Sequence, residues 1–360
     1  MAEEGTEAEG EERVPAEALL EAVQAIFERC GMPTGKAFLL ADSLVYADLR
    51  GIHSHGVLRV PEYVQKLTTG GVDPQGQPFI ARERGACLVV DGSNSMGQIG
   101  AHFAMEHVIA RARLYGIAAA AIRGSNHCGA MAYFAIQALP HDMIGIATTN
   151  ALPTMAPWGG TDKLLGINPL GVAIPAGEEP PIVYDAAFSG SSHGKIRIHH
   201  QKGLPLPEGW ALDKEGRPTT DPAAALEGLL MPIGGFKGVG LALIMGILSS
   251  MLSGAAYGVE LGSMEEGPRP GMDGHFVAAI QVGAFEDVRR FKARVDKAIR
   301  QLRQAHKAPG VTRIYAPGEL EHERAQTSRA RGIPLNPVTL ADLRRTAAAV
   351  GVNTPWLARA

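Results

Sequence analysis

The sequence predicts an α/β fold of mixed α+β type, with helical material at both ends of the chain. Near each end, apolar residues recur at helical spacing. Between the ends lie several apolar runs of strand length, separated by helices without strict βαβ alternation. The 360 residues are 46% hydrophobic and 20% charged, which is typical of a globular protein with a large core.

Three helices are predicted at the start of the chain. The first ends at residues 31–33 (Gly-Met-Pro) and has an apolar stripe formed by Leu19, Leu20, Val23, Ile26, Phe27 and Cys30. Thr34 is the predicted cap of the second helix, and Gly51 is placed to end it in the left-handed conformation. A third helix is expected to run to about Thr68.

The middle of the chain is predicted to consist of short buried strands and helices. Five strands are expected, at 86–90, 117–122, 142–149, 170–174 and 182–186. A helix is expected over 98–115 and a long loop over 202–222. The remaining expectations are a buried helix over 241–256, a strand over 274–282, an amphipathic helix over 286–303, a strand over 311–315 and a closing helix capped by Thr339.

These elements suggest a division of the chain into three parts. Residues 1–14 are expected to be a disordered acidic tail, because six glutamates crowd the first thirteen positions. Residues 15–80 and 305–360 are expected to pack together as one helical domain. Residues 81–304 are expected to form a second domain that contains the sheet.

Charge and composition argue against several classes of protein. The net charge is −3, and removing residues 1–13 takes away six glutamates and one arginine and leaves +2, so nucleic acid is not an expected partner. The acidic start has no apolar core of a secretory signal, and the apolar run 241–256 is too short to span a membrane. Three separated cysteines suggest neither disulfides nor a zinc ribbon. The sequence therefore predicts a cytoplasmic protein with no membrane partner.

A polar turn at residues 50–59 carries the first candidate catalytic residues. It contains Ser54, the imidazoles of His53 and His55, and the guanidinium groups of Arg50 and Arg59. An imidazole can transfer a proton near neutral pH, and a guanidinium can bind a carboxylate through two parallel hydrogen bonds. The turn is interpreted either as an acid–base site for a small organic acid or as a polar surface turn between two helices.

A second candidate segment is Gly-Ser-Asn-His-Cys-Gly at residues 124–129, directly after a predicted strand. Its glycines allow a ligand to approach the backbone, and His127 follows the carboxyl end of the strand, where α/β sheets commonly bind ligands. The amides of the next helix could bind an anion. The alternative is an ordinary strand–helix connection with one surface histidine.

Several further residues have both a functional and a structural interpretation. Lys237 lies in a glycine-rich turn at 234–240. This turn is interpreted either as a phosphate site that uses Lys237 or as a means of packing the following buried helix tightly. Thr154 could line a pocket, and Asp185 at the end of a strand could orient an imidazole or be solvated. Lys195 is interpreted as a surface charge from the sequence pattern alone.

Two common kinds of binding site, a glycine-rich nucleotide-binding loop and a metal site, have weak or no support in the sequence. No GxGxxG follows a strand, and the segment 91–100 has neither the glycine spacing nor the GK[ST] of a phosphate-binding loop. A metal site formed by His53, His55 and His127 remains an alternative, although no HExxH or CxxC motif supports it.

Taken in order, these segments resemble the malate/L-lactate dehydrogenase-like family, which includes ureidoglycolate dehydrogenase and 2,3-diketo-L-gulonate reductase. The resemblance covers nearly everything after about residue 15. Each segment alone is weakly specific, but the ordered set is specific. The segments are 50–59, 125–129, 153–160 with 166–169, 185–195, 234–240 and 316–319.

The resemblance implies roles for individual residues. Ser54, His55 and Asp185 would form a proton-relay group, and Arg59 would hold the substrate carboxylate with Thr154 nearby. His127 is the alternative acid–base residue. The cofactor would contact His127, Cys128, Gly129, Asn168, Pro169, Lys195, Lys237, Arg313, Pro317, Gly318 and Glu319.

The resemblance also implies a cofactor, a fold and an assembly. The cofactor would be NAD or NADP, with NAD favoured, on a mixed sheet that differs from the doubly wound dinucleotide fold. Members form homodimers with sites near the subunit interface. This chain has Cys128 where many relatives have an aromatic residue, and the segment 186–193 departs from the usual pattern.

The predicted function is hydride transfer between nicotinamide and C2 of a small 2-hydroxy or 2-oxo acid, with His55 exchanging the proton. Ser54 and Asp185 would orient His55 and stabilise its imidazolium form. The alternatives are an NADPH-dependent reductase of a cyclic imino acid, a metal-dependent hydrolase using the three histidines, and a cofactor-binding protein without catalysis.

Overall fold

The computed structural model describes residues 11–353, and residues 1–10 of the predicted tail lie outside this range. The prediction of disorder is wrong for the last part of that tail. Residues Glu12–Val14 form β1, which pairs antiparallel with β14 (Ile333–Leu335). Val14 is buried in the core, so the strand joins the two ends of the described chain.

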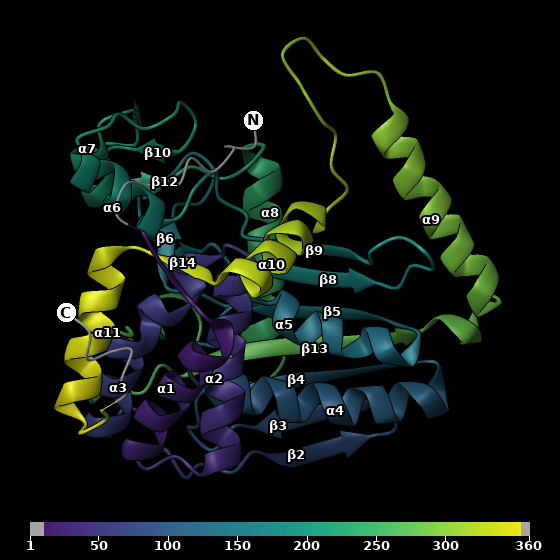
Figure 1. The fold of residues 1–360 in the computed structure, drawn as a ribbon, viewed down its shortest axis with the longest axis horizontal. Coiled ribbons are helices and arrows are strands. Elements are labelled where there is room, and N and C mark those ends of the chain that lie inside the picture. Colours follow the sequence, from purple (N-terminus) through teal and green to yellow (C-terminus); the bar gives the residue numbers. More distant parts are fainter. Residues whose placement is uncertain (1–10, 354–360) are drawn as a thin grey trace.

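One hydrophobic core joins helices from both ends of the chain (Figure 1). It contains residues of α1 (Ala16–Arg29), α2 (Thr34–Leu49), α3 (Val60–Thr69) and α11 (Pro337–Ala349). The three N-terminal helices are confirmed. The predicted domain boundaries stay a prediction.

Two predicted helix caps are wrong. The second helix is preceded by Pro33, and Thr34 is its first helical residue. The closing helix starts two residues before Thr339, because the Asn336 side chain accepts a hydrogen bond from the Thr339 N–H at 2.8 Å and Pro337 fits the first helical position.

Seven strands form one mixed sheet in the order β2-β3-β4-β13-β5-β8-β9 (Figure 1). β3 and β4 are parallel, and every other neighbouring pair is antiparallel, so the carboxyl ends of β3, β4, β5 and β9 share one edge. The mixed α/β fold is thus confirmed. The strands are β2 (Phe79–Arg84), β3 (Cys87–Asp91), β4 (Ile117–Ser125), β5 (Met143–Thr149), β8 (Leu170–Ile174), β9 (Ile182–Ala186) and β13 (Asp273–Gln281).

Helices α4 (Gly97–Tyr115) and α5 (Ala132–Ala135) lie against this sheet (Figure 1). The apolar side of α4 packs on β4 and β13 in a second core, which includes Met105, Val108 and Ile122. The sequence does not predict β2, because this edge strand is polar and largely exposed.

The predicted buried helix over 241–256 is wrong in both length and burial. α8 (Phe236–Gly246) is followed by a π-helical turn at Ile247–Met251. Ile244 and Met251 are 51% and 55% exposed, so the apolar side of this segment is uncovered in the single chain. Within residues 11–353, no helix has the length and apolar character needed to cross a membrane.

The predicted long loop contains regular elements that cover a third, smaller core. β10 and β11 form a short hairpin, and β10 also pairs with β12. A second small sheet joins β6 and β7. The elements of this region are β6 (Pro153–Met155), β7 (Leu165–Gly166), α6 (His193–Lys202), β10 (Ala211–Leu212), β11 (Pro218–Thr219), α7 (Pro222–Glu227) and β12 (Leu229–Leu230).

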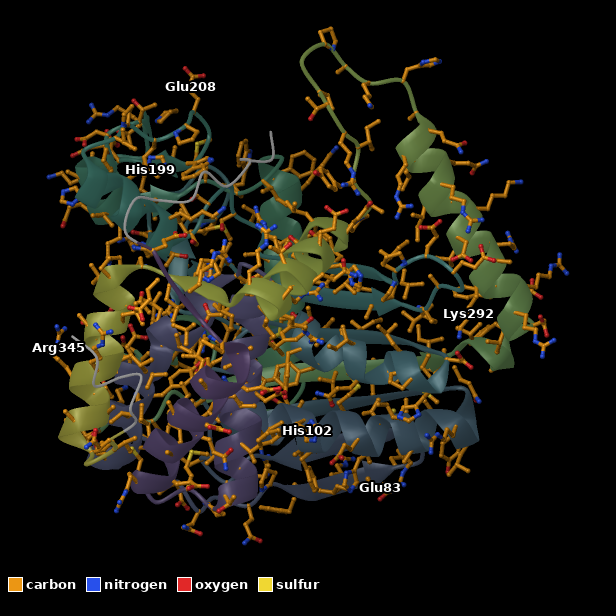
Figure 2. The ribbon with its side chains drawn as sticks, in the orientation of Figure 1. Glu83, His102, His199, Glu208, Lys292 and Arg345 are labelled. Carbon is orange, nitrogen blue, oxygen red and sulfur yellow. The ribbon has the colours of Figure 1, made fainter. Side chains whose placement is uncertain are left out.

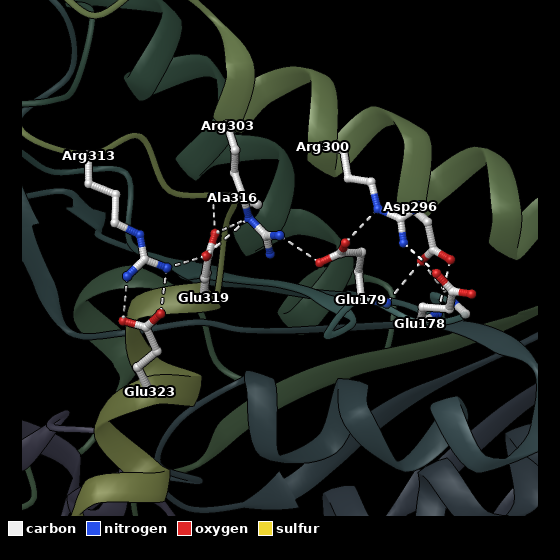
Figure 3. Close-up of polar contacts among 10 residues, drawn as sticks. Glu178, Glu179, Asp296, Arg300, Arg303, Arg313, Ala316, Glu319 and Glu323 are labelled. Atoms are coloured by element: carbon white, nitrogen blue, oxygen red, sulfur yellow. Dashed lines mark hydrogen bonds and ion pairs between the residues drawn. The ribbon is translucent and has the colours of Figure 1, made fainter.

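α9 (Val288–Gln304) stands at the side of the molecule, and the following segment extends as a long loop (Figure 1). Lys292 of α9 forms an ion pair with Asp142 near the base of the helix (Figure 2). The predicted strand over 311–315 is wrong: Arg313 there is held by Glu319 and Glu323 of α10 (Glu319–Arg331), a helix that the sequence analysis missed (Figure 3).

Candidate active site

A buried carboxylate fixes the turn that carries the first candidate residues. Asp48, near the end of α2, is 1% exposed and accepts hydrogen bonds of 2.7 Å from the Val57 N–H and from His53 Nδ1. Burial lowers the pKa of His53, but the hydrogen bond and charge of Asp48 outweigh it and raise that pKa. A Cβ on Gly56 would lie 2.1 Å from Asp48 Oδ1, so only glycine fits this turn. His53 therefore has a structural role.

Asp48→Ala is expected to lower the free energy of unfolding by about 2 kcal/mol, because it leaves the buried Val57 N–H without an acceptor. Asp48→Asn keeps an acceptor and is expected to cost less. Urea denaturation of the two variants measures the difference. Equal stability of Asp48→Ala and the wild type would contradict this account of the turn.

The turn places His55 next to two polar partners. Ser54 Oγ and His55 Nδ1 are 2.9 Å apart, and the ring of His55 stacks on that of His127 with 5.9 Å between centroids. Burial, and then the charge of Arg59, lowers the pKa of His55 to about 4. His55 is therefore neutral near pH 7, and the prediction of a stabilised imidazolium is wrong for this structure.

Arg59 lies in the same cluster, and part of its guanidinium group is already hydrogen-bonded to the protein. Its Nε donates a 2.8 Å hydrogen bond to the Ser54 carbonyl, and its Nη1 donates one of 2.8 Å to Glu62. About a quarter of each of these two charged side chains is exposed (26% and 25%). The guanidinium lies near both histidine rings and lowers the pKa of each.

His127, after β4, is held by two residues that the sequence patterns do not predict as part of a site. Tyr63 Oη is 2.7 Å from His127 Nδ1, and Gln98 Nε2 donates a 3.1 Å hydrogen bond to Tyr63 Oη. Tyr63 belongs to the apolar stripe of α3, and Gln98 lies at the start of α4. The polar groups of these side chains, on otherwise apolar sides of helices, were the available signal.

The two residues after His127 point in different directions. The Cys128 thiol is buried against His275, with its Sγ 3.4 Å from Nδ1, and burial raises its pKa. Gly129 has a φ of +75° and donates its N–H to His127 Nδ1 at 3.3 Å. Cys128 therefore faces the core, whereas Gly129 supports the histidine.

Asp185 lies apart from the histidine cluster. Its carboxylate accepts a 2.7 Å hydrogen bond from the Ala132 N–H, at the start of α5, and it has no hydrogen bond to Ser54 or His55 among the described residues. Burial raises the pKa of Asp185 to about 6, although the backbone hydrogen bonds lower it. The predicted contact between Asp185 and the other relay residues is not formed in the single chain.

Asp185 lines a cavity of about 350 Å³. Arg50 and Glu321 also line the cavity. The Nε atom of Arg50 is buried without a hydrogen-bond partner in the described part of the chain. Ala132 forms part of its wall, five residues after His127, so the loop 127–132 connects the cavity to the histidine cluster.

The predicted C-terminal residues form or support the cavity wall. Pro317 and Gly318 line it, and Gly318 has a φ of +85° and would place a Cβ 2.5 Å from the Val183 carbonyl oxygen. Glu319 accepts a hydrogen bond from the Ala316 N–H at 2.9 Å and pairs with Arg303 and Arg313 (Figure 3). Arg313 and Glu319 thus do not line the cavity, and they support the segment that forms its wall.

The other predicted residues lie in or near the third core and do not line this cavity. The Asn168 side chain bonds to the Ala151 N–H and the Ala242 carbonyl, so its polar atoms are already used. The hydroxyl of Thr154 is buried without a partner among residues 11–353, and the Pro169 carbonyl accepts a hydrogen bond from the Thr148 hydroxyl. The Nζ atom of Lys195 lies 5.9 Å from the centre of the Trp210 ring. Lys237 is exposed at the start of α8.

The geometry gives no support to the metal alternative. His53 uses its Nδ1 for Asp48, and within the described range no three His, Cys, Asp or Glu side chains are grouped as metal ligands would be.

Comparisons with known proteins identify the family. The family model described as malate/L-lactate dehydrogenase matches residues 14–344. Malate dehydrogenase of Pyrococcus abyssi is 35% identical over 361 residues, covering 98% of this chain and 99% of that protein. A Pseudomonas putida reductase of Δ1-pyrroline-2-carboxylate and Δ1-piperideine-2-carboxylate is 34% identical over 334 residues, covering 92% and 96%.

Solved structures agree with this assignment. Sulfolactate dehydrogenase from Methanocaldococcus jannaschii superposes with a TM-score of 0.90 at 34% identity, covering 95% of this chain and 98% of that one. The resemblance stated from the sequence is therefore confirmed, and the chain belongs to the malate/L-lactate dehydrogenase family.

Proposed function

We propose that this chain is an NAD(P)-dependent dehydrogenase of small 2-hydroxy acids, which reduces 2-oxo acids in the reverse direction. The observation that supports this proposal most strongly is the imidazole of His55, bonded to Ser54 and placed beside the Arg59 guanidinium, in a chain of this family. A base next to a carboxylate-binding cation suits the oxidation of a hydroxy acid. NAD is the favoured cofactor and the cytoplasm the expected location.

The cavity beside Asp185 fits part of a nicotinamide dinucleotide. Its volume of about 350 Å³ is large enough for a nucleoside-sized group. Arg50 Nε is a buried donor without a partner in the described chain, and the Asp185 carboxylate is an acceptor, so both could bond hydroxyl or amide groups. When bound, the nicotinamide ring supplies a hydride acceptor at C4. Asp185, Pro317 and Gly318 would hold the dinucleotide there.

The residues of the histidine cluster then have distinct tasks. Arg59 binds the substrate carboxylate and orients C2. His55 takes the proton of the C2 hydroxyl during oxidation and returns it during reduction, while Ser54 holds the ring at Nδ1. An anionic substrate paired with Arg59 offsets the cation that lowers the pKa of His55, and so favours proton uptake when it is needed.

The low pKa of His55 predicts an unusual pH profile. Oxidation requires neutral His55, and a pKa of about 4 leaves it neutral throughout the range from pH 5.5 to 7.5. The value of kcat/KM for the hydroxy acid, measured at saturating cofactor so that protonation of Asp185, whose pKa is about 6, does not limit cofactor binding, is therefore expected to change by less than about twofold over that range. A steady decline below pH 6.5, as an unperturbed histidine would give, contradicts the assignment.

We also propose a homodimer formed through the apolar side of α8. Leu241, Ile244, Ile247 and Met251 recur at helical spacing and are between 40% and 55% exposed. Ile244→Asp is expected to convert a dimer into a monomer, measured by light scattering during size-exclusion chromatography. Val338→Asp, at a 68% exposed position on α11, is the matched control. A dimer that survives Ile244→Asp contradicts the choice of this face.

Nicotinamide absorbance across a substrate panel tests the function. The purified protein is assayed with NAD and NADP against 2-hydroxy acids, 2-oxo acids and cyclic imino acids. Turnover of a hydroxy acid, unaffected by chelators, is the expected result. Turnover of cyclic imines alone would favour the activity of the Pseudomonas putida relative. No change with any pair would overturn the proposal.

A further inference from the structure

The Nδ1 atom of His127 is contacted by two groups from different parts of the fold. Gly129 directs its backbone N–H at this atom from 3.3 Å, and Tyr63 Oη lies 2.7 Å from it. Gln98 approaches Tyr63 Oη from the other side at 3.1 Å. The histidine, the tyrosine and the glutamine therefore form one chain of hydrogen bonds that starts at α4.

The fixed direction of the backbone N–H determines where the proton of His127 lies. A peptide N–H cannot rotate, so it can bond to Nδ1 only if this atom presents its lone pair. The neutral ring must then carry its proton on Nε2. An unprotonated Nδ1 cannot donate, so the Tyr63 O–H must be the donor in the 2.7 Å contact with it. The single lone pair of Nδ1 is then shared between this short bond and the longer one from the Gly129 N–H.

The assignment of the Tyr63 proton to His127 also determines which end of the Gln98 amide faces Tyr63. Since the Tyr63 O–H proton is used on His127, the Tyr63 oxygen is free to accept, and Gln98 must present its amide N–H. Gln98 is fully buried, and its Oε1 has no partner among the described residues. Within residues 11–353, the contact with Tyr63 is therefore the one side-chain hydrogen bond made by this buried amide.

We propose that Gln98 and Tyr63 are positioning residues that hold His127 as its neutral Nε2–H tautomer, so that His127 donates a hydrogen bond to the substrate's C2 oxygen and does not act as the base. This inference rests on the proposed function. The Nε2 proton stays on His127 throughout, and His55 alone exchanges the substrate proton. Burial and the nearby Arg59, His55 and His275 lower the pKa of His127 well below its usual value, which agrees with a ring that stays neutral.

Nitrogen NMR of the full chain labelled with ¹⁵N-histidine tests the tautomer without requiring turnover. The His127 signals are assigned by their loss in His127→Gln. The expected result, between pH 6 and 8, is an unprotonated Nδ1 and a protonated Nε2. A protonated Nδ1, or a ring that gains a second proton in this range, overturns the inference.

Variants test the two positioning residues. Gln98→Leu and Tyr63→Phe are expected to mix the two tautomers of His127 and to lower kcat roughly tenfold, with little change in the KM of the cofactor. Gln326→Leu, exposed on α10, is the matched control. Gln98→Leu also removes a buried oxygen without a partner in the described chain, so its melting temperature is expected to stay close to that of the wild type.

The outcomes separate this inference from the proposed function. Unchanged kcat and unchanged nitrogen signals in both variants would show that the two residues only fill space. An absence of nicotinamide turnover in the wild type would overturn the dehydrogenase proposal, while the NMR result would still decide the tautomer.

Discussion

His55→Ala is expected to lower kcat for hydroxy-acid oxidation by roughly 10²- to 10⁴-fold, because the base that accepts the C2 hydroxyl proton is lost. Cofactor affinity is expected to change little, since His55 does not line the cavity beside Asp185. Stopped-flow absorbance gives kcat, and quenching of protein fluorescence gives the dissociation constant of the cofactor.

Two further substitutions make this result specific. His141→Ala changes an imidazole two residues before β5, at the opposite edge of the sheet, and is expected to leave kcat unchanged. His127→Ala is expected to reduce kcat without shifting the pH profile, because His127 donates a hydrogen bond and does not titrate. Near-normal kcat in His55→Ala, combined with the loss of a pH-dependent step in His127→Ala, would reverse the two assignments.

Arg59→Ala is expected to raise the KM of the acid by about 10²-fold or more, because a charge-assisted contact with the carboxylate is lost. The cofactor KM is expected to stay within about twofold. The substitution also removes a cation that lowers the pKa of His55, so the acidic limb of kcat/KM is expected to move to higher pH.

Glu62→Gln is the matched variant for Arg59. Glu62 accepts a 2.8 Å hydrogen bond from Arg59 and competes with the substrate for the guanidinium. Its neutral replacement is therefore expected to keep the KM of the acid equal or to lower it. An unchanged KM in Arg59→Ala would contradict the role of Arg59, and a strongly raised KM in Glu62→Gln would show that this pair must stay intact.

Much of the fold could be predicted from local patterns. The helices before residue 70 follow from apolar periodicity and from the glycines that come after them, and the strands β4, β8 and β9 follow from short apolar runs. The edge strand β2 and the helix α10 carry no apolar pattern, because β2 is largely exposed and α10 consists mostly of polar and charged residues. Residues 311–315 have the composition of a strand, but among the described residues no neighbouring strand pairs with them.

The part of the candidate site that could be predicted is also local in the sequence. Ser54, His55 and Arg59 lie within six residues, so a local motif was sufficient to bring them together. Asp185 lies on β9, and its actual partner is the backbone of Ala132. That partner follows from the order of strands in the sheet, which one sequence does not reveal. Tyr63 and Gln98 were missed because each is a buried residue within an otherwise structural helix.

The fate of the hydrogen on C2 tests the central claim most directly. The wild-type protein is given the hydroxy acid that turns over fastest, carrying deuterium at C2, together with the oxidised cofactor. Mass spectrometry then locates the label. The proposed chemistry predicts deuterium at C4 of the reduced nicotinamide and none in the solvent. Deuterium released into water, with unlabelled nicotinamide, would contradict hydride transfer at this site.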